Sequence, residues 1–293
     1  MLNISNVYKS YGEKEVLKGV SFKVNAGEIV GLIGENGSGK TTLIKTILGS
    51  VIADSGVIQF KEKDNYISDS FSMKEIGYLL DIDLIQELNA VELLKLYSLY
   101  ENKGYNLKKT EEALQEFKLP RGSKIKEYSY GMQQRLRLLL ALDETRQLLI
   151  LDEPLLGLDI TSIDLMKKVL KQFVSQGGSV LLSSHQLAEI QDIVDRYIIL
   201  DDGIINEEFT GNSVVFQVEV RSELGEFVKL TSLLNECDVL FQKEEEHRRL
   251  YVDPENLNRV LQEAFKLNLE VNIEQKNIIN QTLLRKSKVG SNE

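Results

Sequence analysis

The chain has a single cysteine, Cys237, among 293 residues, and that scarcity excludes an intrachain disulfide. One free thiol is typical of proteins that work in a reducing compartment. A catalytic pair between Cys237 and His247 is not favoured, because nothing else around the thiol indicates a nucleophile site.

Long apolar runs are missing as well. None approaches the ~20 consecutive apolar residues that a membrane-spanning helix needs. The first residues, Met1 to Ser5, lack the basic and apolar blocks of a secretory signal. We therefore expect a cytoplasmic chain, and any role at the inner face of the cell membrane would come through a partner protein.

Positive charge is in deficit. The 35 Lys and Arg residues face 45 Asp and Glu residues, which gives a formal net charge of −10. This balance argues against a nonspecific nucleic-acid binder, so we expect no nucleic-acid partner. The length leaves room for two domains, one large and one small.

The most informative segment reads Gly-Glu-Asn-Gly-Ser-Gly-Lys-Thr-Thr over residues 34–42. It follows an apolar strand pattern at 28–33 and opens an amphipathic stretch at 43–48, as the phosphate-binding pattern G-x-x-x-x-G-K-[ST] requires. The glycines let backbone N–H groups converge on an anion, and the helix start adds unpaired donors. The segment predicts a nucleoside triphosphate site whose candidate contacts are Gly34, Asn36, Gly37, Ser38, Gly39, Lys40, Thr41 and Thr42.

Two of these side chains have expected tasks. Lys40 is placed to reach the β- and γ-phosphates, and the Thr41 hydroxyl to coordinate Mg²⁺. The second motif of the site is acidic. It lies at 148–153, where four apolar residues precede Asp152 and Glu153, and we call it the second acidic motif. Because ligands bind at the carboxyl edge of an α/β sheet, we expect Asp152 to hold Mg²⁺ through water and Glu153 to act as general base on the attacking water.

Strand and helix patterns alternate along residues 1–210, and the order predicts an α/β fold with a parallel sheet wrapped on both faces. Residues 1–60 contain short strands and turns, and residues 82–142 are mostly helical. Further strands are expected at 29–33, 148–151, 179–184 and 197–200. Helices are expected at 87–100, 110–117, 132–142, 163–173 and 187–194.

A domain boundary is expected within residues 201–212. Residues 211–284 then follow a β-α-β-β-α-β order, with strands near 213–220, 238–242, 247–252 and 269–273 and helices near 225–235 and 254–265. That order suggests a small ferredoxin-like α+β domain. The tail 285–293 has the composition of a disordered segment.

Taken together with three further segments, these motifs resemble those of the ATP-binding subunits of ATP-binding cassette (ABC) transporters over about residues 1–210. Tyr11 matches the family's adenine-stacking aromatic. The stretch 128–132, Tyr-Ser-Tyr-Gly-Met, occupies the place of the signature motif. Asp159 matches the aspartate that follows the second acidic motif, and His185 matches the switch histidine at the end of a core strand. The resemblance implies a P-loop NTPase fold with a helical subdomain at about 82–142.

The resemblance further implies a head-to-tail dimer. Ser129 and Gly131 of one subunit would close over the γ-phosphate held by Lys40 of the other, so two ATP molecules and Mg²⁺ lie between two subunits. The partner cassette can be the same chain or another one, giving a homodimer or a heterodimer. A separate transmembrane permease subunit would respond to ATP binding and hydrolysis.

Two positions depart from the family pattern. Tyr130 replaces a common glycine of the signature, as in drug- and peptide-exporting relatives. The place of the usual Q-loop glutamine holds Asp81, which is shorter and charged. By resemblance Asp81 would be a catalytic-site residue that holds Mg²⁺ and connects the γ-phosphate to the surface where the permease docks, with Leu80 or Ile82 as the alternative alignment.

The signature Gly-Met-Gln-Gln-Arg and the small C-terminal domain resemble exporters of bacitracin, lantibiotics and peptide toxins. The alternative is a non-transport ABC ATPase, acting in DNA repair or translation or as a regulatory switch. Repair and translation proteins usually carry two cassettes or a long coiled coil, and this chain has neither. Glu153 and His185 argue against an inactive regulatory module.

Overall fold

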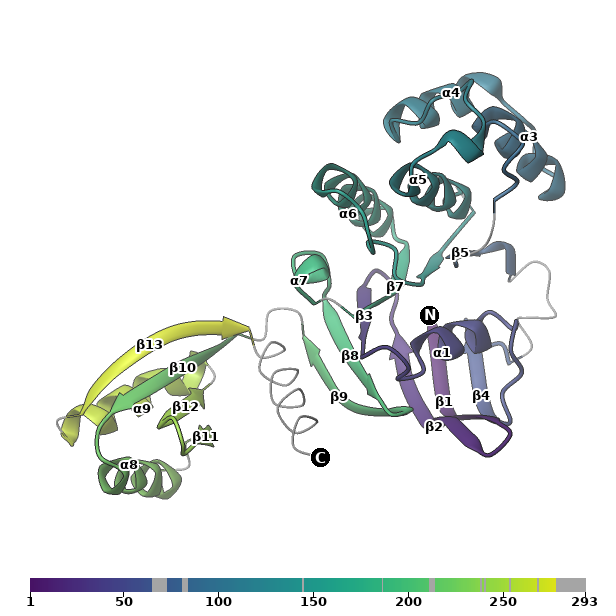
Figure 1. The fold of residues 1–293 in the computed structure, drawn as a ribbon. Coiled ribbons are helices and arrows are strands. Elements are labelled where there is room, and N and C mark those ends of the chain that lie inside the picture. The colour runs from purple at the N-terminus through teal and green to yellow at the C-terminus, as the bar shows by residue number, and fades with distance from the viewer. Residues whose placement is uncertain are drawn as a thin grey trace. The chain divides into compact units, whose positions relative to one another are not determined.

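The computed structural model describes residues 1–64, 73–80, 84–143, 145–185, 187–210, 214–237, 239, 241–252, 254–267 and 269–277. Asp81 and the tail 285–293 lie outside these residues, so their predicted roles remain predictions. The chain folds into two compact units, Met1–Gly211 and Asn212–Glu293 (Figure 1).

A six-stranded sheet forms the centre of the first unit. Its strand order is β5-β6-β7-β3-β8-β9, and its bounds are β3 (Ile29–Ile33), β5 (Ile76–Leu79), β6 (Leu148–Leu151), β7 (Ser179–Ser184), β8 (Arg196–Asp201) and β9 (Ile204–Thr210). The first five strands in this order run parallel, and β9 is antiparallel to β8. Every residue of β3, β6 and β7 is buried. A parallel sheet covered on both faces explains why these strands are apolar throughout.

Strand β9 was missed by the sequence analysis, which gave residues 201–212 only a domain boundary; the division between the two units falls at the end of that range, after Gly211. A turn at Asp202 and Gly203, both with positive φ, reverses the chain so that β9 pairs with β8. The residues that appear as a polar linker in the sequence therefore form the edge of the core sheet.

A second, antiparallel sheet belongs to the same unit. It has the order β2-β1-β4 and consists of β1 (Leu2–Tyr11), β2 (Lys14–Val24) and β4 (Ser55–Phe60). Its buried face shares one apolar core with the central strands and with α1 (Lys40–Ile47), through residues such as Ile4, Val20, Leu32, Leu43 and Phe60.

The helical region contains α3 (Ala90–Tyr100), α4 (Leu107–Glu116), the 3₁₀ turn η1 (Ile125–Glu127) and α5 (Tyr130–Ala141), which gather together in Figure 1. Each helix start has a side-chain cap: Asn89 forms a capping box with Glu92, Asn106 caps α4 and Ser129 caps α5. Polar caps satisfy the first unpaired N–H groups, so the helices begin where the caps are.

Two further helices belong to this unit, α6 (Ile160–Ser175) and α7 (Leu187–Ile190), and α6 packs against β7 and α5. The prediction of a helix over 187–194 was too long. Asp195 donates its N–H to the Ile29 carbonyl (2.9 Å) and accepts the Ile29 N–H on its carboxylate (2.8 Å). These bonds draw the chain onto β3 and leave α7 as a single turn.

The second unit contains β10 (Val214–Arg221), α8 (Leu224–Glu236), β11 (Gln242–Glu244), β12 (Arg249–Val252), α9 (Pro254–Lys266) and β13 (Glu270–Asn277). All pairs in the sheet β11-β12-β10-β13 are antiparallel. This is the split βαβ arrangement that the element order suggests. Its own core includes Val218, Phe227, Leu230, Leu250 and Val260. Strand β11 starts at 242, where the sequence prediction ended its strand.

Candidate active site

The loop between β3 and α1 is shaped by its glycines. Gly37 and Gly39 have φ values of 88° and 110°, a region that suits glycine. A Cβ at Gly34 would lie 2.3 Å from the Leu200 carbonyl oxygen, so a side chain does not fit there. The loop therefore needs glycine at both fixed glycine positions of the pattern, Gly34 and Gly39, and it has a third positive-φ glycine at Gly37. Helix α1 begins directly behind it.

Lys40 is buried at the base of this loop, with 6% of its surface exposed. Its Nζ donates to the carbonyl oxygens of Gly34 (2.7 Å) and Glu35 (3.1 Å) and lies 3.6 Å from Oε1 of Glu153. The contacts hold one positive charge at a fixed place between the loop and the carboxyl edge of the sheet.

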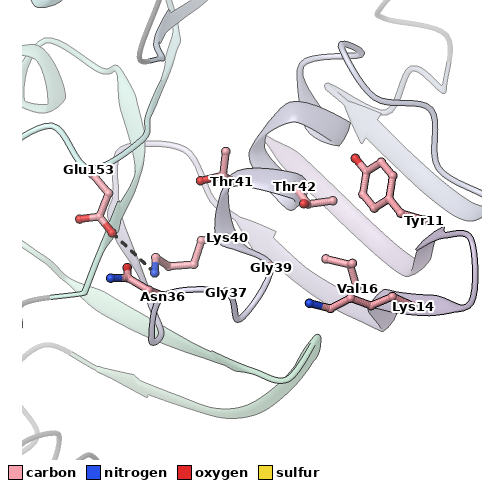
Figure 2. A pocket seen from close by; sticks show the side chains of 10 residues that line it. All are labelled: Tyr11, Lys14, Val16, Asn36, Gly37, Gly39, Lys40, Thr41, Thr42 and Glu153. Carbon is pink, nitrogen blue, oxygen red and sulfur yellow. Dashed lines mark ion pairs between the residues drawn. The ribbon is translucent and has the colours of Figure 1, made fainter.

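A cavity of about 420 Å³ opens in front of the loop. Figure 2 shows Tyr11 at one end of this cavity and Glu153 at the other, with Lys40 and Thr41 between them. The lining is made by the hairpin of β1 and β2, the loop and the second acidic motif: Tyr11, Lys14, Val16, Asn36, Gly37, Gly39, Lys40, Thr41, Thr42 and Glu153. An aromatic ring at one end, with a cation and a loop rich in N–H groups beside it, suits a nucleotide.

Lys14 and Val16 were missed by the sequence analysis. Tyr11 and Lys14 are register partners across the tight turn between β1 and β2. The sequence did contain a signal for these two residues. Strand β2 starts only three residues after Tyr11, so the hairpin brings the start of β2 back to the pocket that Tyr11 lines.

A hydrogen-bonded network joins the loop to the acidic residues. The Thr41 hydroxyl donates to Oδ2 of Asp152 (2.8 Å), and the Ser183 hydroxyl donates to Oδ1 of the same carboxylate (2.6 Å). Ser183 also accepts the backbone N–H of Glu153 (2.9 Å). Ser183 was not among the predicted site residues, yet Leu151 pairs with Leu182 across β6 and β7, so the next residues on the two strands are neighbours.

Glu153 is held from several sides. Its φ of 45° is in the left-handed region, which is uncommon outside glycine and recurs at functional sites. Oε2 lies 2.9 Å from Nδ1 of His185. Nearby, burial raises the pKa of the Glu189 carboxyl on α7, and the negative charge of Glu153 raises it further, against the lowering effect of His185 and Lys167.

The second group of predicted residues lies at the starts of α5 and α6. Ser129 accepts the Met132 N–H (3.3 Å), and Asp159 accepts the Ser162 N–H (3.0 Å). The bonds from Ser162 lower the pKa of Asp159. A Cβ on Gly131 would lie 3.5 Å from a methyl carbon of Leu158 and 3.6 Å from the Ser162 hydroxyl, so the two helix starts pack together.

The structure thus divides the predicted residues into two groups. Tyr11, the phosphate loop, Asp152, Glu153 and His185 meet in or beside the cavity. Ser129, Gly131 and Asp159 are not among the residues that line it.

Comparisons with known proteins agree with this geometry. Residues 17–156 match the family model described as ABC transporter. The chain is 32% identical over 217 residues to the lantibiotic transport ATP-binding protein SrtF of Streptococcus pyogenes, covering 72% of this chain and 93% of SrtF. The chain belongs to the ABC transporter family.

Two further relatives complete the picture. The cassette is 36% identical over 213 residues to the linearmycin resistance ATP-binding protein LnrL of Bacillus subtilis, covering 69% of this chain and 67% of LnrL. It also resembles a solved dimeric ATP-binding cassette in a post-hydrolysis state bound to ADP and phosphate, with a TM-score of 0.65, 26% identity, and coverage of 72% of this chain and 99% of that one.

The family and fold predictions are confirmed: the chain is an ABC ATPase with a P-loop NTPase fold, and its nucleotide is ATP. None of the helices in the described part of the chain is long and apolar enough to cross a membrane.

Proposed function

We propose that this cassette is the ATP-hydrolysing subunit of a bacterial exporter, whose cargo is an antimicrobial or toxin peptide or a drug. The names of two relatives support the cargo class, since one transports a lantibiotic and the other confers linearmycin resistance. A separate transmembrane permease carries the cargo, and this cassette binds that permease at the inner face of the cell membrane and powers it.

The site residues have distinct proposed tasks. Tyr11 stacks on adenine, and the backbone N–H groups of the loop bind the phosphates. Lys40 neutralises the β- and γ-phosphates. Glu153 takes the proton from the attacking water, and His185, 2.9 Å away, orients the Glu153 carboxylate and the γ-phosphate. Asp81 retains its predicted link to the permease.

The metal-binding donors fit Mg²⁺. Thr41 and Asp152 are 2.8 Å apart, oxygen to oxygen, and Mg²⁺ prefers oxygen ligands and substrate phosphates. When bound, the ion would neutralise charge that develops on the phosphates. Ser183 holds the Asp152 carboxylate in place from the other side.

The observation that carries the proposal is the separation of the two groups of site residues. The cavity contains the phosphate loop and the base but none of Ser129, Gly131 and Asp159. A second cassette, placed head to tail, supplies these residues to the γ-phosphate. Dimer closure over two ATP molecules is then the conformational step that drives the permease.

The Glu153→Gln variant tests this function. The amide retains the shape but cannot accept a proton, so hydrolysis should fall roughly 10²–10⁴-fold while ATP still binds. Light scattering with Mg²⁺-ATP should show the variant accumulating as a dimer. Glu62→Gln, at an exposed position away from the cavity, should behave as the wild type. A monomeric Glu153→Gln variant at saturating Mg²⁺-ATP would contradict the proposal.

The permease is tested separately. A tagged full-length cassette, isolated from its native membranes, should bring with it one multi-span protein, and the ATPase rate should change when the two are reconstituted in lipid. A rate that is indifferent to that protein would favour a stand-alone ATPase.

A further inference from the structure

A group of charged and polar side chains, one buried and four half-buried, lies where α3 meets the edge of the six-stranded sheet. We call it the junction cluster and define it by Tyr97, Glu101, Lys103, Asp143 and Arg146. None of these residues lines the nucleotide cavity. The cluster joins three segments: the end of α3, the loop between α5 and β6, and the start of β5.

Arg146 is the centre of the cluster, with 3% of its side chain exposed. Nη1 donates to the carbonyl oxygens of Lys74 and, at 3.0 Å, Ile76, where β5 begins. Nη2 donates to the Tyr97 hydroxyl (2.7 Å) and lies 3.4 Å from Oε1 of Glu101. A planar guanidinium can point donors in two fixed directions at once, so Arg146 ties α3 to β5 directly.

Lys103 adds a second connection. Its Nζ lies 2.6 Å from Oδ1 of Asp143 and 3.8 Å from Oε2 of Glu101. Burial alone would raise the pKa of Asp143, but the hydrogen bonds from Lys103 and Thr145 lower it overall. The two positive and two negative side chains therefore balance, which is the condition under which buried charges are tolerated.

The cluster can act on the signature because the helices pack as a group. Helix α3 packs against α4 and α5, and α5 packs against β5 (Figure 1). A change in the angle of α3 to the sheet edge would therefore reach α5 through this packing. Ser129 and Gly131 are at the start of α5, so they move with that angle.

We propose that Arg146 is a positioning residue for the composite ATP site. It holds the α3–α5 group at one angle to the sheet and so presents Ser129 and Gly131 to a partner cassette. The inference rests on the proposed head-to-tail dimer for its effect on catalysis, while the positioning itself occurs within one chain.

The test variant is Tyr97→Phe, which removes the hydroxyl that joins Arg146 to α3 and retains the ring. Replacing Arg146 would remove the donor to the Lys74 and Ile76 carbonyls, leave Glu101 with the longer contact to Lys103, and endanger folding. Tyr100→Phe is the matched control, because Tyr100 is on the same helix with 81% of its surface exposed.

The first measurement is an intrachain distance. In a Cys237→Ser background, spin labels are attached through Lys108→Cys on α4 and Lys45→Cys on α1, both at exposed positions. Tyr97→Phe should broaden or shift the distance distribution, and Tyr100→Phe should leave it unchanged. An unchanged distribution in Tyr97→Phe overturns the inference.

The second measurement is dimerisation in the Glu153→Gln background. Tyr97→Phe should weaken the Mg²⁺-ATP dimer at least about fivefold, which is roughly 1 kcal/mol, while ATP affinity of the single chain stays the same. If Tyr97 has a merely structural role, Tyr97→Phe should lower the melting temperature but change neither the distance distribution nor the dimer affinity. If the Glu153→Gln parent does not dimerise, the proposed function fails, and the label distances alone decide on Arg146.

Discussion

The phosphate-loop side and the signature side of this cassette are built in different ways. The loop is interior: Ser38 and Lys40 are 7% and 6% exposed, and Lys40 is bonded to its own loop and faces Glu153. The signature is exterior: Tyr130 is 47% exposed, and Ser129 caps α5 at an exposed position.

This difference shows where the residues that support each side of the cassette are located. The loop has its supports within the chain, because Thr41, Asp152, Ser183 and Glu153 form one network. The start of α5 is a helix N-terminus, a place that suits a phosphate, but it does not line the cavity of its own chain. Under the proposed function, the loop side binds ATP within one chain, and the signature side acts on the ATP held by a second cassette.

The largest effect should come from Lys40→Ala, which breaks the loop side. Loss of the fixed charge on two phosphates should weaken ATP binding about 100-fold or more, since charge-assisted hydrogen bonds contribute roughly 1.5–3 kcal/mol each. Isothermal calorimetry measures the ATP affinity of the variant. Lys45→Ala, one turn further along α1 and exposed, is the control and should bind ATP normally. Equal affinities for both variants would disprove the loop assignment.

Ser183→Ala refines the comparison, because it weakens the hydrogen-bonded network around Asp152 and Glu153 but replaces no residue of the phosphate loop. It leaves the Glu153 N–H and one Asp152 oxygen without their partner, which costs about 1–3 kcal/mol of local stabilisation. The ATPase turnover number should fall roughly tenfold, with ATP affinity nearly unchanged. A drop in affinity without a drop in turnover would show that Ser183 acts on binding instead.

The smallest effect should come from ending the chain at residue 211. Every site residue named above lies in the first unit, which has its own core. ATP affinity should change less than about twofold, roughly 0.4 kcal/mol, because the cavity is lined by residues of the first unit. Calorimetry on a folded truncation checks this, with circular dichroism as the folding control. Loss of binding would show that the second unit completes the site.

The sequence predicted the loop side well because its motif is local. Residues 34–42 are contiguous, and glycine and lysine at fixed spacing determine both the backbone and the chemistry. The strands 29–33, 148–151 and 179–184 were predicted with the observed bounds, since buried parallel strands are continuous apolar runs.

Features that depend on contacts between distant segments were not predicted. Strand β9 forms because of a reversal at Asp202 and Gly203, and α7 is short because Asp195 bonds to Ile29. The contacts of Ser183 and of the junction cluster likewise form only when distant segments of the chain come together. Residue patterns along the sequence do not directly show which distant segments will contact each other.

Mixing two inactive variants tests the central claim that one ATP site needs two cassettes. Lys40→Ala disables the loop, and Ser129→Arg places a bulky cation at the start of α5, so each variant alone should lack ATPase activity. In a head-to-tail dimer of the two, one site combines the intact loop of the Ser129→Arg chain with the intact signature of the Lys40→Ala chain. A 1:1 mixture should recover up to about a quarter of the wild-type rate, because half of the dimers are mixed and half of their sites are intact. A mixture as inactive as its components, or a Ser129→Arg variant that is fully active alone, would contradict the account.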